Sequence, residues 1–308
     1  MIRTLVVPIL LTIATALPPP LPAAETPTRI RIVSGVTAKG DATPLWLAMV
    51  RKRGADDRLA SAIKPLTPEE RAWAQYIRTR SAQWPAQIPA LAQPFAPAGA
   101  PRSISIVLGN RAAADAFTHD EVTIGFDLSE LQRNYGPPTA PANADLMDRL
   151  FRHEFTHLLQ KRWLALHPWP TDSPMRTALY GLWSEGLGNY YSLSARWKPT
   201  AEGPSPATTA ALAELEPLFT ESMAALACTD SATAAPLLAH LSSGPFNKKW
   251  GALPVALWLQ REVARDPEAI RNFAIGGPAG VWDFAARNLP AELAGKVAEA
   301  REATARCN

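Results

Sequence analysis

Residues 142–166 read ANADLMDRLFRHEFTHLLQKRWLAL, a stretch that contains neither proline nor glycine. Apolar and histidine side chains recur in it at intervals of four, three and four residues, at Leu146, Leu150, His153 and His157. A second apolar strip runs beside them, formed by Phe151, Phe155, Leu158 and Leu159. This periodicity predicts an α-helix whose histidines lie on its buried or cleft-facing side. Asn143 is a candidate cap at its start, and Pro168 is expected to stop the helix.

The centre of this helix, HEFTH at residues 153–157, matches the pattern H-E-x-x-H. Residues four apart lie on one helix face, so the imidazoles of His153 and His157 can converge on one metal ion. Glu154 is then placed to take a proton from a water on the open side of the metal. The alternative is a core helix with two hydrogen-bonded histidines, but two histidines at metal spacing around a glutamate favour a metal site.

A catalytic zinc ion usually takes three protein ligands and leaves a fourth position for water. The six-residue step to a third histidine fails here because Trp163 stands at that position, and His167 lies too far along the helix. Glu185 is the better candidate, since it lies in a second predicted helix over residues 174–197 that can pack back along the first. The alternative for Glu185 is a solvated helix glutamate, which its apolar and glycine-rich neighbours disfavour.

Asn189 is four residues beyond Glu185 and shares its helix face. A side chain there can hold a ligand histidine through the second ring nitrogen, which is the usual arrangement around a bound metal. We therefore expect Asn189 to orient one of the two histidines.

HEFTHLLQ at residues 153–160, followed by an E-G-x-x-x-Y pattern at residues 185–190, resembles the gluzincin branch of zinc metallopeptidases, and most of all its peptidase-MA-like bacterial families. The resemblance covers about residues 146–197. It implies an α+β, zincin-like catalytic core with a helical C-terminal domain. It also implies Zn²⁺ held by three side chains, those of His153, His157 and Glu185. One departure is Gly188, where the family usually has alanine.

The mechanism implied by the resemblance is hydrolysis of peptide bonds by zinc-activated water, with Glu154 as general base and as proton donor to the leaving amine. The developing oxyanion needs a further hydrogen-bond donor. Tyr190 stands at the family position for it, and Tyr191 is its neighbour. On an ideal helix Tyr190 lies about 140° from Glu185, so a packed core aromatic is an equal alternative.

Residues 1–24 have the pattern of a secretory signal: one positive charge, a short apolar run and small residues before a cleavage site at Ala16 or near Ala24. A retained N-terminal anchor is the alternative. No other stretch reaches the roughly 18 apolar residues of a membrane span, so we expect no stable membrane insertion after signal removal. The two cysteines, Cys228 and Cys307, are expected to pair, as exported proteins seldom keep free thiols. The predicted location is periplasmic or secreted.

Composition excludes one class of partner. Without residues 1–24, which hold one arginine, 30 basic residues stand against 28 acidic ones. Such a balanced charge argues against nucleic acid as a partner. The partner that the resemblance implies is a peptide or protein substrate. The oligomeric state stays open.

Three parts follow one another along the chain: an α/β part at residues 25–145, the zinc-binding helices at 146–197 and a helical domain at 198–308. Strands are predicted at 29–33, 103–108 and 122–128, and a helix that Thr67 caps is predicted to run to Trp84. By analogy with zinc peptidases, Val122–Leu128 is proposed as an edge strand that pairs with extended substrate; an ordinary sheet strand is the alternative.

Two classes of function fit these features. The first is an exported zinc metallopeptidase. The second is a catalytically inactive, zincin-like periplasmic binding or scaffold protein. Hydrolysis of a non-peptide amide, such as a cell-wall bond, is a weaker third possibility.

Overall fold

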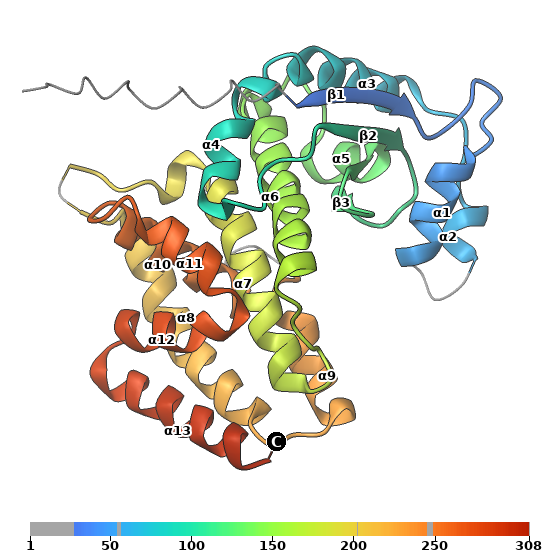
Figure 1. The fold of residues 1–308 in the computed structure, drawn as a ribbon. Coiled ribbons are helices and arrows are strands. Elements are labelled where there is room, and N and C mark those ends of the chain that lie inside the picture. Colours follow the sequence, from blue (N-terminus) through green and yellow to red (C-terminus); the bar gives the residue numbers. More distant parts are fainter. Residues whose placement is uncertain (1–27, 54–56, 202, 245–248, 308) are drawn as a thin grey trace, which may run out of the picture.

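The computed structural model describes residues 28–53, 57–201, 203–244 and 249–307, and the fold is α+β (Figure 1). The predicted signal at residues 1–24 lies outside the described residues. The strands are β1 (Arg29–Ser34), β2 (Ser103–Gly109), β3 (Ala116–Thr118) and β4 (Thr123–Asp127). The first five helices are α1 (Pro44–Arg53), α2 (Arg58–Ser61), α3 (Pro68–Ser81), α4 (Ile88–Ala92) and α5 (Leu128–Tyr135). The others are α6 (Leu146–Leu166), α7 (Pro174–Ser192), α8 (Pro206–Leu226), α9 (Ser231–His240), α10 (Ala252–Val263), α11 (Ala269–Gly276), α12 (Val281–Asn288) and α13 (Ala291–Cys307).

The four strands form one sheet in the order β1-β2-β4-β3. β1, β2 and β4 run parallel, whereas the short β3 pairs antiparallel with β4. The prediction that Val122–Leu128 forms the edge strand is therefore wrong, because β4 lies between β2 and β3 and all five of its residues are buried. A three-residue strand is too short to show periodicity in the sequence, and β3 occupies the edge instead.

The two faces of the sheet are covered by different helices. Ile104, Ile106 and Leu108 point into the large core that α3, α6 and α7 share. Val107 points the other way, into a smaller cluster with Trp46 and Met49 of α1. This alternation is the period of two expected of a strand buried on both faces.

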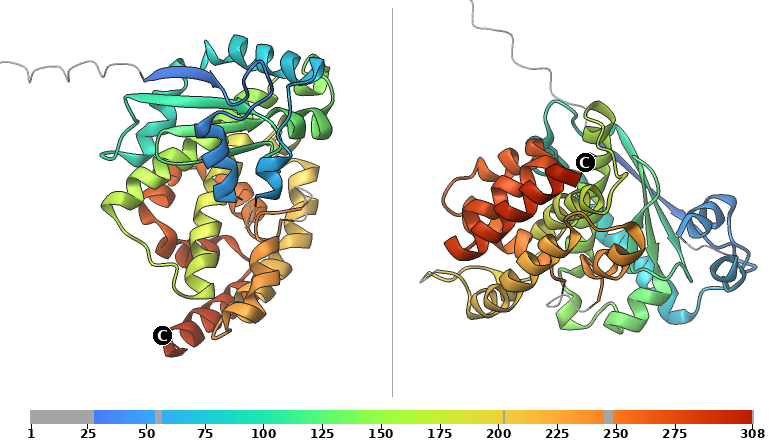
Figure 2. Two further views of the ribbon diagram at one scale, coloured as in Figure 1. Left: turned by 90° about the vertical axis from the view of Figure 1, so that its right-hand side faces the viewer. Right: turned by 90° about the horizontal axis from the view of Figure 1, so that it is seen from below.

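α7 is the central helix of the molecule and packs between α6 and α10 (Figures 1 and 2). A Cβ atom added at Gly186 would lie 2.3 Å from Cγ1 of Val255, so the α7–α10 contact depends on that glycine. Buried side chains from α3 through α13 belong to one continuous cluster. The helical C-terminal region thus packs on α7, and α7 in turn packs on α6.

Most predicted element boundaries agree with the structure, with local exceptions. Thr67 caps α3 in a capping box with Glu70, but the helix ends at Ser81. α6 begins at Leu146, and Asn143 is not its cap: its amide donates to the carbonyl oxygens of Tyr135 and Pro137.

The C-terminal tail is tied back to the helical region as predicted. A disulfide joins Cys228, just after α8, to Cys307 at the end of α13. Among the described residues, no helix is both long enough and apolar enough to cross a membrane.

Candidate metal centre

His153 and His157 lie one turn apart on α6, and Glu185 reaches them from the neighbouring α7. The loop between these helices, residues 167–173, contains two prolines and lets the chain reverse so that α7 packs on α6. Ser173 caps α7 by accepting a hydrogen bond from the backbone N–H of Arg176. The packing of α7 on α6 therefore brings the three predicted side chains together.

The ligand atoms of these three side chains converge between the two helices. Nε2 of His153 lies 3.0 Å from Nε2 of His157 and 3.5 Å from Oε2 of Glu185. Oε1 of Glu185 lies 3.7 Å from Nε2 of His157. Atoms bound to zinc at about 2.0–2.1 Å in a tetrahedron lie about 3.3–3.4 Å apart, so the observed spacings bracket the required value. The donor set, two imidazoles and one carboxylate, also suits a catalytic zinc site with a free fourth position.

The pKa values of the two histidines and of Glu185 are shifted by burial and by the contacts among these three side chains. Burial alone would lower the pKa of His153, but the hydrogen bond and charge of Glu185 raise it. Burial alone would raise the pKa of Glu185, yet the two histidines bring it to about 2. Burial lowers the pKa of His157 to about 4. The pKa values of His153 and Glu185 are thus shifted in opposite directions by their contact with each other.

His157 is held by residues to which the sequence analysis gave no role. Its Nδ1 lies 2.8 Å from Oε1 of Gln160 and 3.1 Å from Oγ of Ser184. The Gln160 amide in turn donates to the backbone carbonyls of Trp183 and Ser184 on α7. Because this amide orientation leaves Oε1 as the acceptor, Nδ1 of His157 carries the proton and Nε2 is free to bind a metal. The available signal was the position of Gln160, three residues after His157 on the same helix.

His153 is held by close packing. A Cβ atom added at Gly188 would lie 2.8 Å from Cε1 and 2.9 Å from Nδ1 of His153. The imidazole therefore rests directly against the backbone of α7. The lack of a Cβ atom at Gly188 is what leaves room for this position of the ring.

Glu154 lies beside the three ligands and is 5 % exposed. Burial raises the pKa of its carboxyl group to about 7; the charge of His153 opposes this rise, and those of Glu185 and Asp115 add to it. Its side chain lines the same cleft as His153 and His157, as the predicted role of a general base requires.

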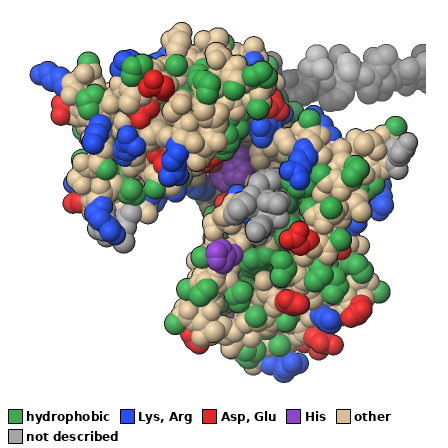
Figure 3. Space-filling model, turned by 180° about the vertical axis from the view of Figure 1, so that it is seen from behind, with side chains coloured by type: hydrophobic (Ala, Val, Ile, Leu, Met, Phe, Trp, Pro, Cys, Tyr) green, Lys and Arg blue, Asp and Glu red, His purple; other side chains and the backbone are tan. Residues whose placement is uncertain are grey.

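The site opens into a cleft of about 900 Å³, which is lined by residues of β3, α6 and α7. A smaller pocket of about 270 Å³ adjoins it, and His157, Glu185 and Thr118 line both. Figure 3 shows histidine surface at the bottom of a hollow between two lobes of the molecule, with basic side chains on the rim. His157 and Glu185 thus lie where the larger cleft and the smaller pocket meet, and His153 lines the cleft.

Three residues do not take the roles that the sequence predicted for them. Tyr190 and Tyr191 do not line the cleft or the pocket; their rings pack edge to face at 5.1 Å and contact the core. Asn189 lines the cleft, yet among the described residues its buried amide nitrogen has no hydrogen-bond partner. The structure therefore does not join Asn189 to a histidine, and Gln160 performs that role for His157.

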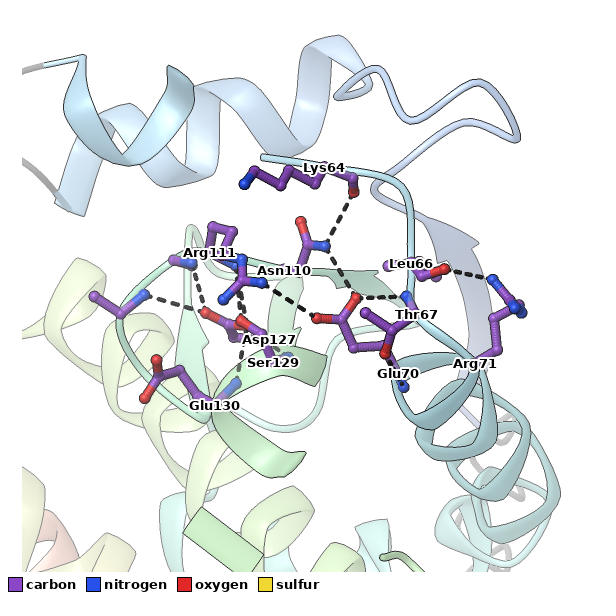
Figure 4. A network of polar contacts seen from close by, with 12 residues as sticks. Lys64, Leu66, Thr67, Glu70, Arg71, Asn110, Arg111, Asp127, Ser129 and Glu130 are labelled. Atoms are coloured by element: carbon purple, nitrogen blue, oxygen red, sulfur yellow. Dashed lines mark hydrogen bonds and ion pairs between the residues drawn. The ribbon is translucent and has the colours of Figure 1, made fainter. Parts of the chain in front are cut away.

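One wall of the cleft is the segment of residues 113–115, which a network of polar contacts holds in place (Figure 4). The carboxylate of Asp127 accepts hydrogen bonds from the backbone N–H groups of Arg111, Ala112 and Ala113, and also caps α5. Buried Glu70 accepts a hydrogen bond from Asn110. These two carboxylates fix the turn from which β3 starts.

Comparison with family models, with curated proteins and with solved structures found no match.

Proposed function

We propose that this protein is an exported, zinc-dependent metallopeptidase of the gluzincin type with a zincin-like catalytic core. The observation that carries the proposal is the convergence of His153, His157 and Glu185 beside the buried Glu154, at the floor of an open cleft. A structural zinc site would be closed by a fourth protein ligand, whereas this set leaves one position to the cleft. The residues present thus fit a catalytic zinc site better than a structural one.

The roles of the side chains follow from their positions. Zinc held there would polarise a substrate carbonyl and lower the pKa of water. Glu154 accepts the proton of the attacking water and delivers it to the leaving amine. Gln160 and Ser184 keep His157 in the tautomer that can bind the metal.

β3 supplies a way to hold an extended peptide. Two backbone hydrogen bonds set the pairing of β3 with β4. The N–H of His119 donates to the carbonyl of Thr123, and the N–H of Asp127 donates to the carbonyl of Asp115. In an antiparallel pair the bonding residues alternate, so the backbone polar groups of Ala116 and Thr118 point away from β4. Residues 116–118 line the cleft, where a substrate strand can add to this edge.

Export is supported by the Cys228–Cys307 disulfide, because such bonds persist mainly in oxidising compartments. The signal-like composition of residues 1–24 agrees with this location.

The first experiment measures bound zinc per chain in purified protein and in two variants. We expect about one zinc ion in the natural protein, none in Glu185→Ala, and full zinc in Glu154→Gln. Hydrolysis is then followed on a mixture of peptides by mass spectrometry, where Glu154→Gln should lose at least about 100-fold in rate. Absence of zinc after purification without chelators would refute the proposal. Bound zinc without hydrolysis of peptides, or with hydrolysis of other amides alone, would favour the binding-protein or amidase alternatives.

A further inference from the structure

α6 carries a third polar side chain on the stripe that holds the two histidines. His153, His157 and Lys161 follow one another at intervals of four residues. Lys161 is therefore one turn beyond His157, about 6 Å along the helix axis. It lines the small pocket together with His157 and Glu185.

In the part of the chain that the structure describes, the ammonium group of Lys161 donates hydrogen bonds only to neutral oxygens. It donates to Oγ1 of Thr118 at 2.6 Å and to the backbone carbonyl of Asp120 at 3.4 Å. Within residues 28–307, so far as the structure describes them, no carboxylate forms an ion pair with it. Burial lowers its pKa and Lys52 adds to that effect, while more distant carboxylates, those of Glu154, Asp120 and Glu121, oppose it. A partly desolvated cation thus faces the pocket without an anionic partner.

The rest of the pocket suits an aliphatic stem. The pocket is also lined by Gly181 of α7, by Leu238 of α9 and by Leu241, which follows α9. Tyr180 lines the pocket as well. A group that fits this surface has a short apolar chain and a negatively charged end.

We propose that Lys161 is a specificity-determining residue that binds a carboxylate of the substrate on the small-pocket side of the metal. The carboxylate belongs either to an acidic side chain or to the C-terminus of the peptide. This inference rests on the proposed function, because it assumes that a substrate carbonyl is held at His153, His157 and Glu185. It adds a substrate class, anionic peptides, to that function.

Lys161 also holds the β3–β4 turn, and the test has to separate this role from binding. Lys52 offers a matched control, since its ammonium donates to the carbonyl of His119 in the same turn at 2.9 Å. Lys52 lines neither the pocket nor the cleft. A purely structural role would be shared by both lysines.

The probes are three short peptide hydroxamates, because a hydroxamate chelates zinc and no hydrolysis is needed. The first has a glutamate side chain and an amidated C-terminus. The second has glutamine and a free C-terminal carboxylate, and the third has glutamine and an amidated C-terminus. Their affinities for the zinc-loaded protein are measured by calorimetry in the natural chain, Lys161→Met, Lys161→Arg and Lys52→Met.

We expect one of the two acidic probes to bind about 10- to 100-fold more tightly than the neutral one, as charge-assisted hydrogen bonds do. The acidic probe that shows this advantage identifies the source of the carboxylate. The advantage should vanish in Lys161→Met, persist in part in Lys161→Arg and remain in Lys52→Met. Equal affinity of all three probes, or an advantage that survives Lys161→Met, would overturn the inference. Failure of the proposed function would look different: no bound zinc, or no binding of the neutral probe either.

Discussion

At the scale of single residues, the site depends on side chains that hold the ligands as much as on the ligands themselves. Gly188 gives room to His153, and Gln160 fixes the tautomer of His157. The H-E-x-x-H pattern predicts which residues bind a metal, but it does not say which groups orient their rings. Asn189 has the right helical position for that role, but its amide has no partner among the described residues. Whether Gln160 or Asn189 holds a histidine depends on the orientation of its side chain, and helical spacing does not set that orientation.

Gly188→Ala tests the packing of His153. The added Cβ would lie within 3 Å of the imidazole, so the ring has to shift and zinc affinity should fall about 10- to 100-fold. Competition with a chelator of known affinity measures this. Gly295→Ala is the control, because a Cβ there meets nothing within 4 Å. Unchanged zinc affinity in Gly188→Ala would contradict the observed ring position.

Gln160→Ala removes the hydrogen-bond acceptor of His157 and two bonds to the backbone of α7. We expect a 10- to 100-fold loss of zinc affinity, about 1.4–2.7 kcal/mol. Ser184→Ala removes the longer contact to Nδ1 and a hydrogen bond to Oε1 of Gln160, but it leaves Gln160 in place and should cost less. The same chelator competition checks the order, and a larger loss in Ser184→Ala would show that Ser184 is the main partner of His157.

At the scale of elements, the cleft wall is set by how β4 ends. Asp127, its last residue, caps α5 and binds the backbone of the turn that leads into β3. The sequence pattern identified β4 as a strand. It did not identify the edge, because the hairpin with a three-residue β3 is settled by this turn and not by periodicity.

Asp127→Ala should lower the free energy of unfolding by about 3 kcal/mol, since several buried N–H groups lose their acceptor. Asp127→Asn keeps one acceptor oxygen and should cost less. Chemical denaturation measures both. If the network mainly positions β3, peptide hydrolysis by Asp127→Asn should fall more than its zinc content; parallel loss of both would indicate general unfolding.

At the scale of the whole molecule, the helical C-terminal region and the metal site share one core through α7. The Cys228–Cys307 bond closes the last part of that region, and the two cysteines are 79 positions apart in the sequence. Neither cysteine lines the cleft. Loss of the disulfide should therefore lower the stability of the protein but leave metal binding unchanged.

The double variant Cys228→Ser/Cys307→Ser should lose about 4 kcal/mol of stability by the chain-entropy argument for a loop of this length. That corresponds to a fall in Tm of about 8–16 °C. Calorimetry measures the shift, with the zinc content as a control that should stay at its natural value. An unchanged Tm would mean that α13 is held by packing alone.

The sequence by itself determined the two helices, the ligand types and the disulfide pair, because helical periodicity, the H-E-x-x-H spacing and an even cysteine count are local or countable signals. Only the tertiary structure decided how Glu185 meets the histidines, which strand forms the edge of the sheet, and that Lys161 faces a pocket beside the candidate metal site. These depend on the packing of segments far apart in the chain, notably α7 against α6 and β3 beside β4. One sequence carries no direct record of such contacts, since many packings satisfy the same pattern of apolar and polar residues.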